Sequence, residues 1–121
     1  MVLLDKINID ITRRDYTKSS SFIIERFVVP DNLEGVLLSI NMTYDYINLV
    51  LVYDSCYNLR AETTQMHEER LIKIHEKELN TSSDAKHGLI PEGEWIIAFE
   101  IDSSKDLPES KPICTVEVKA L

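Results

Sequence analysis

The most reactive side chains of this 121-residue chain are those of its two cysteines, Cys56 and Cys114. They form no CxxC pair, and only their separation in space decides whether they can join in a disulfide. No export signal precedes them, so we expect free thiols. Cys114 lies in an alternating stretch and is expected to face the core, whereas Cys56 lies in a turn-like segment and is expected to be more exposed. A reactive thiol needs a neighbouring base or positive field, and the sequence around Cys56 shows neither.

The three histidines, His67, His75 and His87, are eight and twelve residues apart. These spacings match no compact metal-ligand motif, so we expect histidines at the surface or at a rim. The carboxylates are scattered and single out no acid–base pair. The sequence contains no GxxxxGK[ST], GxGxxG or GxSxG motif, and its three glycines leave little material for a phosphate-binding loop. We therefore predict a chain without catalytic residues, metal or cofactor.

The remaining candidates for binding are one acid, one base and a group of tyrosines. Asp54 and Arg60 could form a polar ligand site near the end of a sheet; the alternative is a turn-forming aspartate and a solvated or rim-paired arginine. Most of the five tyrosines cluster between residues 44 and 57, where they could line an exposed binding strip or pack on a hairpin. The candidate ligand or interface residues are Tyr44, Tyr46, Tyr53, Asp54, Tyr57 and Arg60.

Short strands must position these side chains, because apolar residues recur at every second position. The alternation predicts strands over residues 6–11, 21–29, 35–44, 94–101 and 114–119. The run 46–53 is apolar on both faces, which is typical of a central strand covered on two sides. Only Asp45 separates this run from the preceding one, which predicts a tight hairpin or a sharp bend.

The segment 62–80 admits two interpretations. It is rich in good helix formers, and Glu69 and Lys73 form a favourable i,i+4 pair. However, its apolar residues follow no stripe at helical spacing, and a charged edge strand over about 70–77 explains the pattern equally well. We favour the strand, since tertiary context often overrides local propensity.

Short strands at intervals of about 8–12 residues, with turn signals between them, predict an antiparallel β-sandwich. We expect a jelly-roll-like arrangement of about seven to eight strands. No linker or internal repeat divides the chain, so residues 1–121 are expected to form one domain.

Charge and composition restrict the partners. The chain has 13 Lys and Arg against 21 Asp and Glu, a net charge of −8, with a hydrophobic share of 44%. This is a globular composition, and its acidity argues against nucleic acid or an anionic membrane as partner. No apolar run could span a membrane, and Asp5 and Lys6 interrupt the first apolar residues, so we expect a cytoplasmic protein. We attribute the acidic surplus to solubility rather than to binding a cation or a basic partner.

Four segments together resemble a known accessory domain. They are residues 27–40, 47–54, 59–62 and 88–101, the last containing the turn Pro91-Glu92-Gly93-Glu94-Trp95. Their order resembles the β-sandwich N-terminal to some bacterial PHP-type metal-dependent phosphoesterases of the CehA/McbA kind and, more loosely, the pre-peptidase C-terminal type of sandwich. The chain has Leu59-Arg60-Ala61 where the former usually shows Leu-Arg-Gly. The metal-binding PHP domain is absent, so the resemblance implies a PHP-associated accessory sandwich and no phosphoesterase activity.

These observations favour a non-catalytic accessory or interaction module that binds a protein partner or associates into a homo-oligomer. The alternative is a small-ligand or carbohydrate-binding module, with Trp95 as a stacking platform or calcium held by the loop 102–106. Trp95 shares its face with Ile97 and Phe99, which favours a place in the core. A hydrolase using Cys56 or a histidine is a third possibility that no residue spacing supports.

Overall fold

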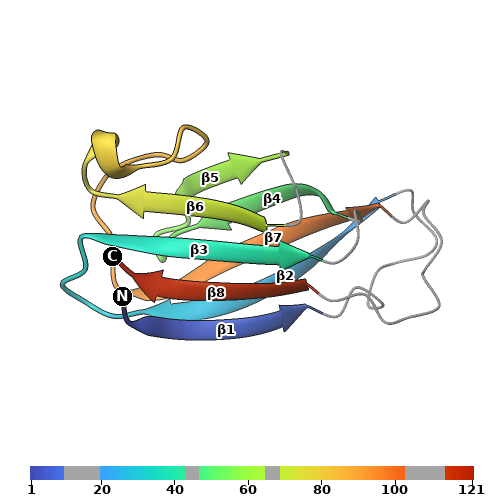
Figure 1. Ribbon diagram of the computed structural model, residues 1–121, viewed down its shortest axis with the longest axis horizontal. Helices are drawn as coiled ribbons and strands as arrows, with labels where there is room; N and C mark the ends of the chain where they lie inside the picture. The colour runs from blue at the N-terminus through green and yellow to red at the C-terminus, as the bar shows by residue number, and fades with distance from the viewer. Residues whose placement is uncertain (10–19, 43–46, 65–68, 103–113) are drawn as a thin grey trace.

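Two four-stranded antiparallel sheets pack face to face in the computed structural model, which describes residues 1–9, 20–42, 47–64, 69–102 and 114–121 (Figure 1). The first sheet has the strand order β1 (Leu3–Ile9), β8 (Cys114–Ala120), β3 (Gly35–Met42), β6 (Glu69–His75). The second has the order β2 (Ser20–Val29), β7 (Gly93–Asp102), β4 (Ile47–Tyr53), β5 (Leu59–Thr63). The predicted antiparallel β-sandwich is confirmed.

The path of the chain is that of a jelly roll. Successive strands alternate between the sheets from β1 to β4 and again from β5 to β8, and the first strand pairs with the last. Such double-sheet folds of eight strands contain two Greek keys. The two termini lie at the same end of the sandwich (Figure 1), where Ala120 N donates to Val2 O at 2.8 Å. The predicted jelly-roll-like arrangement is therefore confirmed.

Two predictions about β4 need correction. Of the two alternatives predicted between β3 and β4, the tight hairpin is wrong, because the two strands belong to different sheets and β4 pairs with β5, the next strand along the chain. The alternative of a sharp bend falls on residues 43–46, outside the described ranges. The central position of β4 between β7 and β5 is confirmed. Cover on both of its faces is not: Val50 and Val52 are fully buried, whereas Leu49 and Leu51 stay partly exposed on the outer face of the second sheet.

The ambiguous segment 62–80 contains the strand that we favoured. β6 lies at the edge of the first sheet, and within the described part of the chain it pairs with β3 alone, in the register Leu38↔Ile72. The pairing buries Ile72 and Ile74 and leaves Leu71 and Lys73 outside. A single 3-10 turn, η2 (Glu78–Asn80), follows. Within the described ranges no helix is long and apolar enough to cross a membrane.

The inward side chains of both sheets form one core. The strands contribute alternate positions, as the pleat of a β-strand requires, except at the bulge of β5, where the adjacent residues Arg60 and Ala61 are both buried. The fully buried side chains with the largest volumes are Trp95, Phe27, Phe99, Leu38, Ile40, Ile72, Ile74, Ile97, Ile101, Val29 and Val36. Burial of these apolar surfaces is the main force that holds the two sheets together.

Candidate functional site

A tight turn after β4 places Asp54 at one end of the second sheet. Its carboxylate Oδ1 accepts hydrogen bonds from the backbone N–H groups of Cys56 at 2.9 Å and Asn58 at 3.1 Å. Its own backbone pairs with Asn58 O and Tyr57 N, both at 3.0 Å. Tyr57, in this turn, has a positive φ of 64°. Asp54 is therefore the turn former that one of the two interpretations predicted.

Arg60 on β5 reaches Asp54 from the neighbouring strand. Its Nη1 lies 3.2 Å from Asp54 Oδ2, and the two side chains are only 6% and 3% exposed. The alternative of a solvated or rim-paired Arg60 is therefore wrong, since Arg60 is buried. The β-bulge between β4 and β5 explains the difference, because the register shift at Tyr53 lets both Arg60 and Ala61 point inward.

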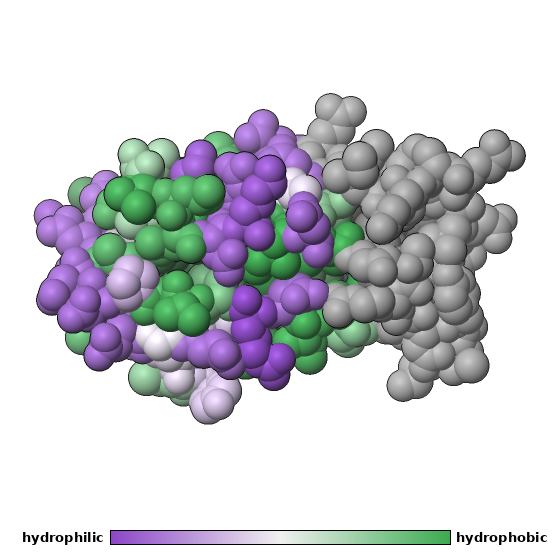
Figure 2. Space-filling view, turned by 90° about the horizontal axis from the view of Figure 1, so that it is seen from below, coloured by the Kyte–Doolittle hydropathy of each residue, from purple (hydrophilic) through white to green (hydrophobic). Residues whose placement is uncertain are grey.

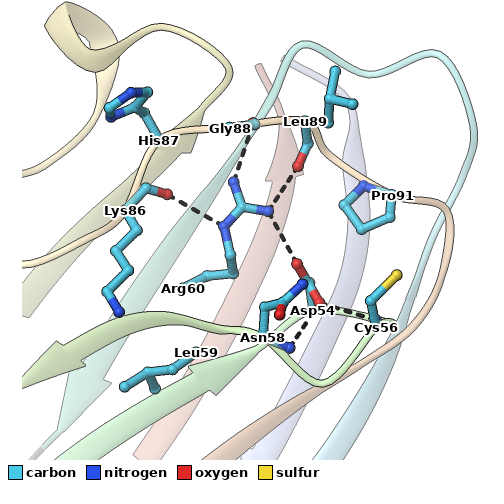
Figure 3. A pocket seen from close by; sticks show the side chains of 10 residues that line it. All are labelled: Asp54, Cys56, Asn58, Leu59, Arg60, Lys86, His87, Gly88, Leu89 and Pro91. Atoms are coloured by element: carbon cyan, nitrogen blue, oxygen red, sulfur yellow. Dashed lines mark hydrogen bonds and ion pairs between the residues drawn. The ribbon is translucent and has the colours of Figure 1, made fainter.

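The rest of the Arg60 guanidinium binds a crossing loop. Nε donates to Lys86 O at 3.2 Å, Nη1 to Leu89 O at 2.7 Å and Nη2 to Gly88 O at 3.1 Å (Figure 3). The centre of the guanidinium also lies 5.6 Å from the centroid of the Trp95 ring. Four of its N–H bonds are thus directed at protein acceptors, so Arg60 fastens the loop to the sheet.

A pocket of about 570 Å³ opens beside this ion pair. The groups that it offers to a ligand are the exposed side chains of Cys56, Asn58, Lys86 and His87, since Asp54 and Arg60 are engaged with protein partners. Cys56 and His87 lie on opposite sides of Arg60 and do not point toward each other (Figure 3). The pocket therefore offers a ligand polar contacts but pairs no base with the thiol.

The structure brings together two of the six candidate residues from the sequence, Asp54 and Arg60. Tyr53 is half-buried at the end of β4, and Tyr57 is exposed in the adjoining turn. Tyr44 and Tyr46 lie outside the described residues, as do Tyr16 and His67 and all but the first residue of the proposed calcium loop 102–106. The tyrosine strip thus stays a prediction.

Trp95 is a core residue, as its alternation with Ile97 and Phe99 predicts. It is fully buried, and its Nε1–H donates to Pro91 O at 2.9 Å. Gly93, two residues before it, has a φ of 121°, and a Cβ there would lie 2.9 Å from Ser55 Cβ. The Pro91-to-Trp95 turn thus needs its glycine. A buried indole ring cannot stack on a sugar, so Trp95 is no carbohydrate platform.

The cysteines and histidines that the structure describes follow the sequence expectations with one exception, and His67 lies outside the described residues. Both thiols are free, with Cys56 exposed and Cys114 buried. Burial raises the pKa of the Cys114 thiol to about 12. His75 is buried rather than at the surface, because it packs on Gly35 and its Nδ1 accepts the Lys77 N–H at 2.9 Å. The described residues include no group of three or more His, Cys, Asp or Glu that could hold a metal ion.

The outer face of the second sheet is a surface that the sequence analysis missed. On the edge strand β2, Phe22, Ile24 and Val28 point outward and are 51%, 49% and 65% exposed. Ile24 aligns across the sheet with Ala98 of β7 and Leu51 of β4. We call this surface the apolar face and define it by Phe22, Ile24, Val28, Leu49, Leu51 and Ile96.

The sequence did carry a signal for this face. Residues 22–29 are apolar at positions that point inward and also at positions that point outward, although β2 is an edge strand. Viewed from the side where β1 and β2 lie, hydrophobic side chains gather in patches with hydrophilic side chains between them (Figure 2). Exposed apolar side chains that are contiguous across strands often mark an interaction site.

Comparisons with protein-family models, with curated proteins and with solved structures find no match for this chain.

Proposed function

We propose that this chain is a non-catalytic interaction module whose binding surface is the apolar face. The observation that carries the proposal is the exposure of Phe22, Ile24 and Val28 on the edge strand β2, with Ile96 on β7 and Leu49 and Leu51 on β4 partly exposed on the same face. An isolated exposed apolar residue needs no explanation, but a patch that continues over three strands does. Binding of a protein surface would remove these side chains from water.

The other sheet provides the contrast that supports this choice. Outward positions of its strands form the row Lys6, Glu117, Ser39 and Leu71, in which three of four residues are polar. Lys73 and Lys119 occupy the outward positions of the next row, on either side of Leu37. This mixed polar surface is typical of a face that stays in water.

The experiment compares three forms of the full chain: wild type, Ile24→Ser on the apolar face, and Leu71→Ser on the opposite sheet as a matched control. Leu71 is 45% exposed, close to the 49% of Ile24. Each form is used to capture partners from a lysate of the source cells, and its oligomeric state is measured by sedimentation. We expect Ile24→Ser to lose a bound protein, or a self-association, that Leu71→Ser retains. Equal behaviour of the two variants would contradict the proposal.

A small-ligand or carbohydrate-binding module is the second candidate, and the pocket of about 570 Å³ beside Arg60 favours it. A ligand there would contact Lys86, His87 and Asn58, since Arg60 is occupied. A glycan array and a calcium thermal-shift assay test this candidate, with Lys86→Met as the variant that should weaken any binding at the pocket. Absence of a signal in both assays would set it aside.

The relation to PHP-associated accessory sandwiches and the cytoplasmic location stay predictions. An accessory sandwich is in keeping with an interaction role, because such domains contribute contacts rather than chemistry.

A further inference from the structure

Glutamates are distributed over the apolar face in a regular way. One cross-strand row runs Phe22, Glu100 and Leu49, and the next runs Ile24, Ala98, Leu51 and Glu62. A further row places Val28 beside Glu94. Each of these three rows therefore joins apolar side chains to one carboxylate, and all three glutamates reach solvent.

One base, Arg26, accompanies the three glutamates of these rows, and Asp102 adds a further acid at the outward end of β7. Arg26 lies 3.3 Å from Glu94 through its Nε and Oε1 atoms, so it offsets that carboxylate. Glu62 and Glu100 have no ion-pair partner among the described residues, so the three glutamates and Arg26 together carry a net charge of −2. On the opposite sheet, by contrast, Lys119 pairs with Glu117 at 3.6 Å and Lys73 adds a positive charge.

A second copy of the chain is a poor occupant for this face. Each copy carries a net charge of −8, and docking two copies through the same face would bring their unpaired glutamates together. Like charges opposed across an interface disfavour association, whereas complementary charges steer the partner and fix its orientation. The favoured occupant is therefore a surface with the opposite charge.

We infer that the apolar face binds a protein partner whose contact surface carries apolar side chains bordered by lysine or arginine. This inference rests on the proposed function and adds the chemical class of the partner. The apolar contacts would supply the affinity, and the bases would meet Glu62 and Glu100 at the ends and centre of the rows. The acidic surplus of the sequence, which we first attributed to solubility, thus includes carboxylates placed for recognition.

The test uses two synthetic amphipathic peptides with the same leucine positions, one with lysine and the other with glutamate at every polar position. Each is titrated into the isotope-labelled full chain, and binding is followed by NMR chemical shifts. We expect the lysine peptide to bind with shift changes centred on β2, β7 and β4, and the glutamate peptide to bind at least about tenfold more weakly. Raising the salt concentration from about 0.05 M to about 0.5 M should weaken the binding of the lysine peptide, because salt screens exposed charges.

Variants separate the apolar and the charged parts of the inference. Ile24→Ser should lower the affinity for the lysine peptide about tenfold, since a central apolar contact is lost. The double variant Glu62→Gln, Glu100→Gln should lower the affinity for the lysine peptide several-fold and make that affinity less dependent on salt. The controls Leu71→Ser and Glu117→Gln on the opposite sheet should change neither the affinity for the lysine peptide nor its salt dependence. All five positions are outward and at least partly exposed, so these variants should keep the fold, which the amide spectrum checks directly.

The outcomes distinguish the inference from the proposed function. Equal binding of both peptides at the apolar face would overturn the charge requirement and leave the interaction role standing. A dimer that buries this face would overturn the inferred basic partner and show that the occupant is a second copy of the chain. Lysine-peptide binding that ignores Ile24→Ser, or no binding to a monomeric chain, would overturn both.

Discussion

Replacing Arg60 with alanine should destabilise the fold more than any change to an exposed ion pair. The substitution removes four hydrogen bonds, one to Asp54 and three to the carbonyls of Lys86, Gly88 and Leu89. It also leaves the Asp54 carboxylate buried without its charge partner. Removing one member of a buried ion pair typically costs about 3–5 kcal/mol of the free energy of unfolding.

A cost of about 4 kcal/mol agrees with the individual contacts. A hydrogen bond to a charged group contributes roughly 1.5–3 kcal/mol, but the three carbonyls lie in a loop at the edge of an open pocket, where water can replace part of the loss. For a chain of this length the change corresponds to a decrease in Tm on the order of 10–15 °C. The contact with the Trp95 ring adds to the loss.

Urea denaturation followed by tryptophan fluorescence measures this free energy, because Trp95 is the single tryptophan and lies in the core. The control is Arg26→Ala, which removes the exposed pair with Glu94 and should cost less than about 1 kcal/mol. In an Asp54→Asn background, Arg60→Ala should cost less than in the wild type, since no carboxylate is left unpaired. If Arg60→Ala lowers the free energy of unfolding no more than Arg26→Ala does, the conclusion that Arg60 fastens the loop to the sheet is refuted.

Three further predictions concern single residues. Under native conditions a thiol reagent should modify Cys56 quickly and Cys114 only after unfolding, as mass spectrometry of the labelled chain would show; equal rates would contradict the burial of Cys114. Burial raises the pKa of Cys114 from 9.0 to about 12, so between these pH values the unfolded chain loses a thiol proton that the folded chain keeps. The free energy of unfolding should therefore fall as the pH rises from 9 toward 12. A Cys114→Ala variant should show a shallower decline in chemical denaturation across that range. Gly93→Ala should cost about 1–3 kcal/mol or more, because φ is 121° and the new Cβ would lie 2.9 Å from Ser55 Cβ; an unchanged Tm would show that the turn can relax.

The local alternation of apolar and polar residues was sufficient to predict most strands of the fold. Period-two alternation predicts the strands that became β2, β3, β7 and β8, and it correctly favoured a strand over a helix for β6. It also places Trp95 and Cys114 in the core, because the pleat fixes which side chains share a face. Of the tight hairpin and the sharp bend predicted at Asp45, the hairpin is wrong, since a short connection in the sequence does not reveal whether the chain stays in one sheet or crosses to the other.

The candidate site was less predictable for the same reason. Asp54 and Arg60 were singled out together, but their burial depends on a bulge between β4 and β5 and on a loop from 26 to 29 residues further along the chain. His75 was expected at the surface, and its burial depends on its register opposite Gly35. The apolar face could not be recognised before the strand order made β2 an edge and aligned Ile24 with Leu51.

The sequence by itself determined that this chain is a β-sandwich, that one thiol is buried and the other exposed, and that it carries a net charge of −8. These properties follow from local alternation and from composition, which need no knowledge of distant contacts. Only the tertiary structure decided which strands are edges, what Arg60 binds, and that glutamates from β5 and β7 lie among apolar side chains from β2 and β4. Those features arise from pairings between residues far apart in the chain, and strand order and register, which fix them, are settled by the packing of the whole sandwich.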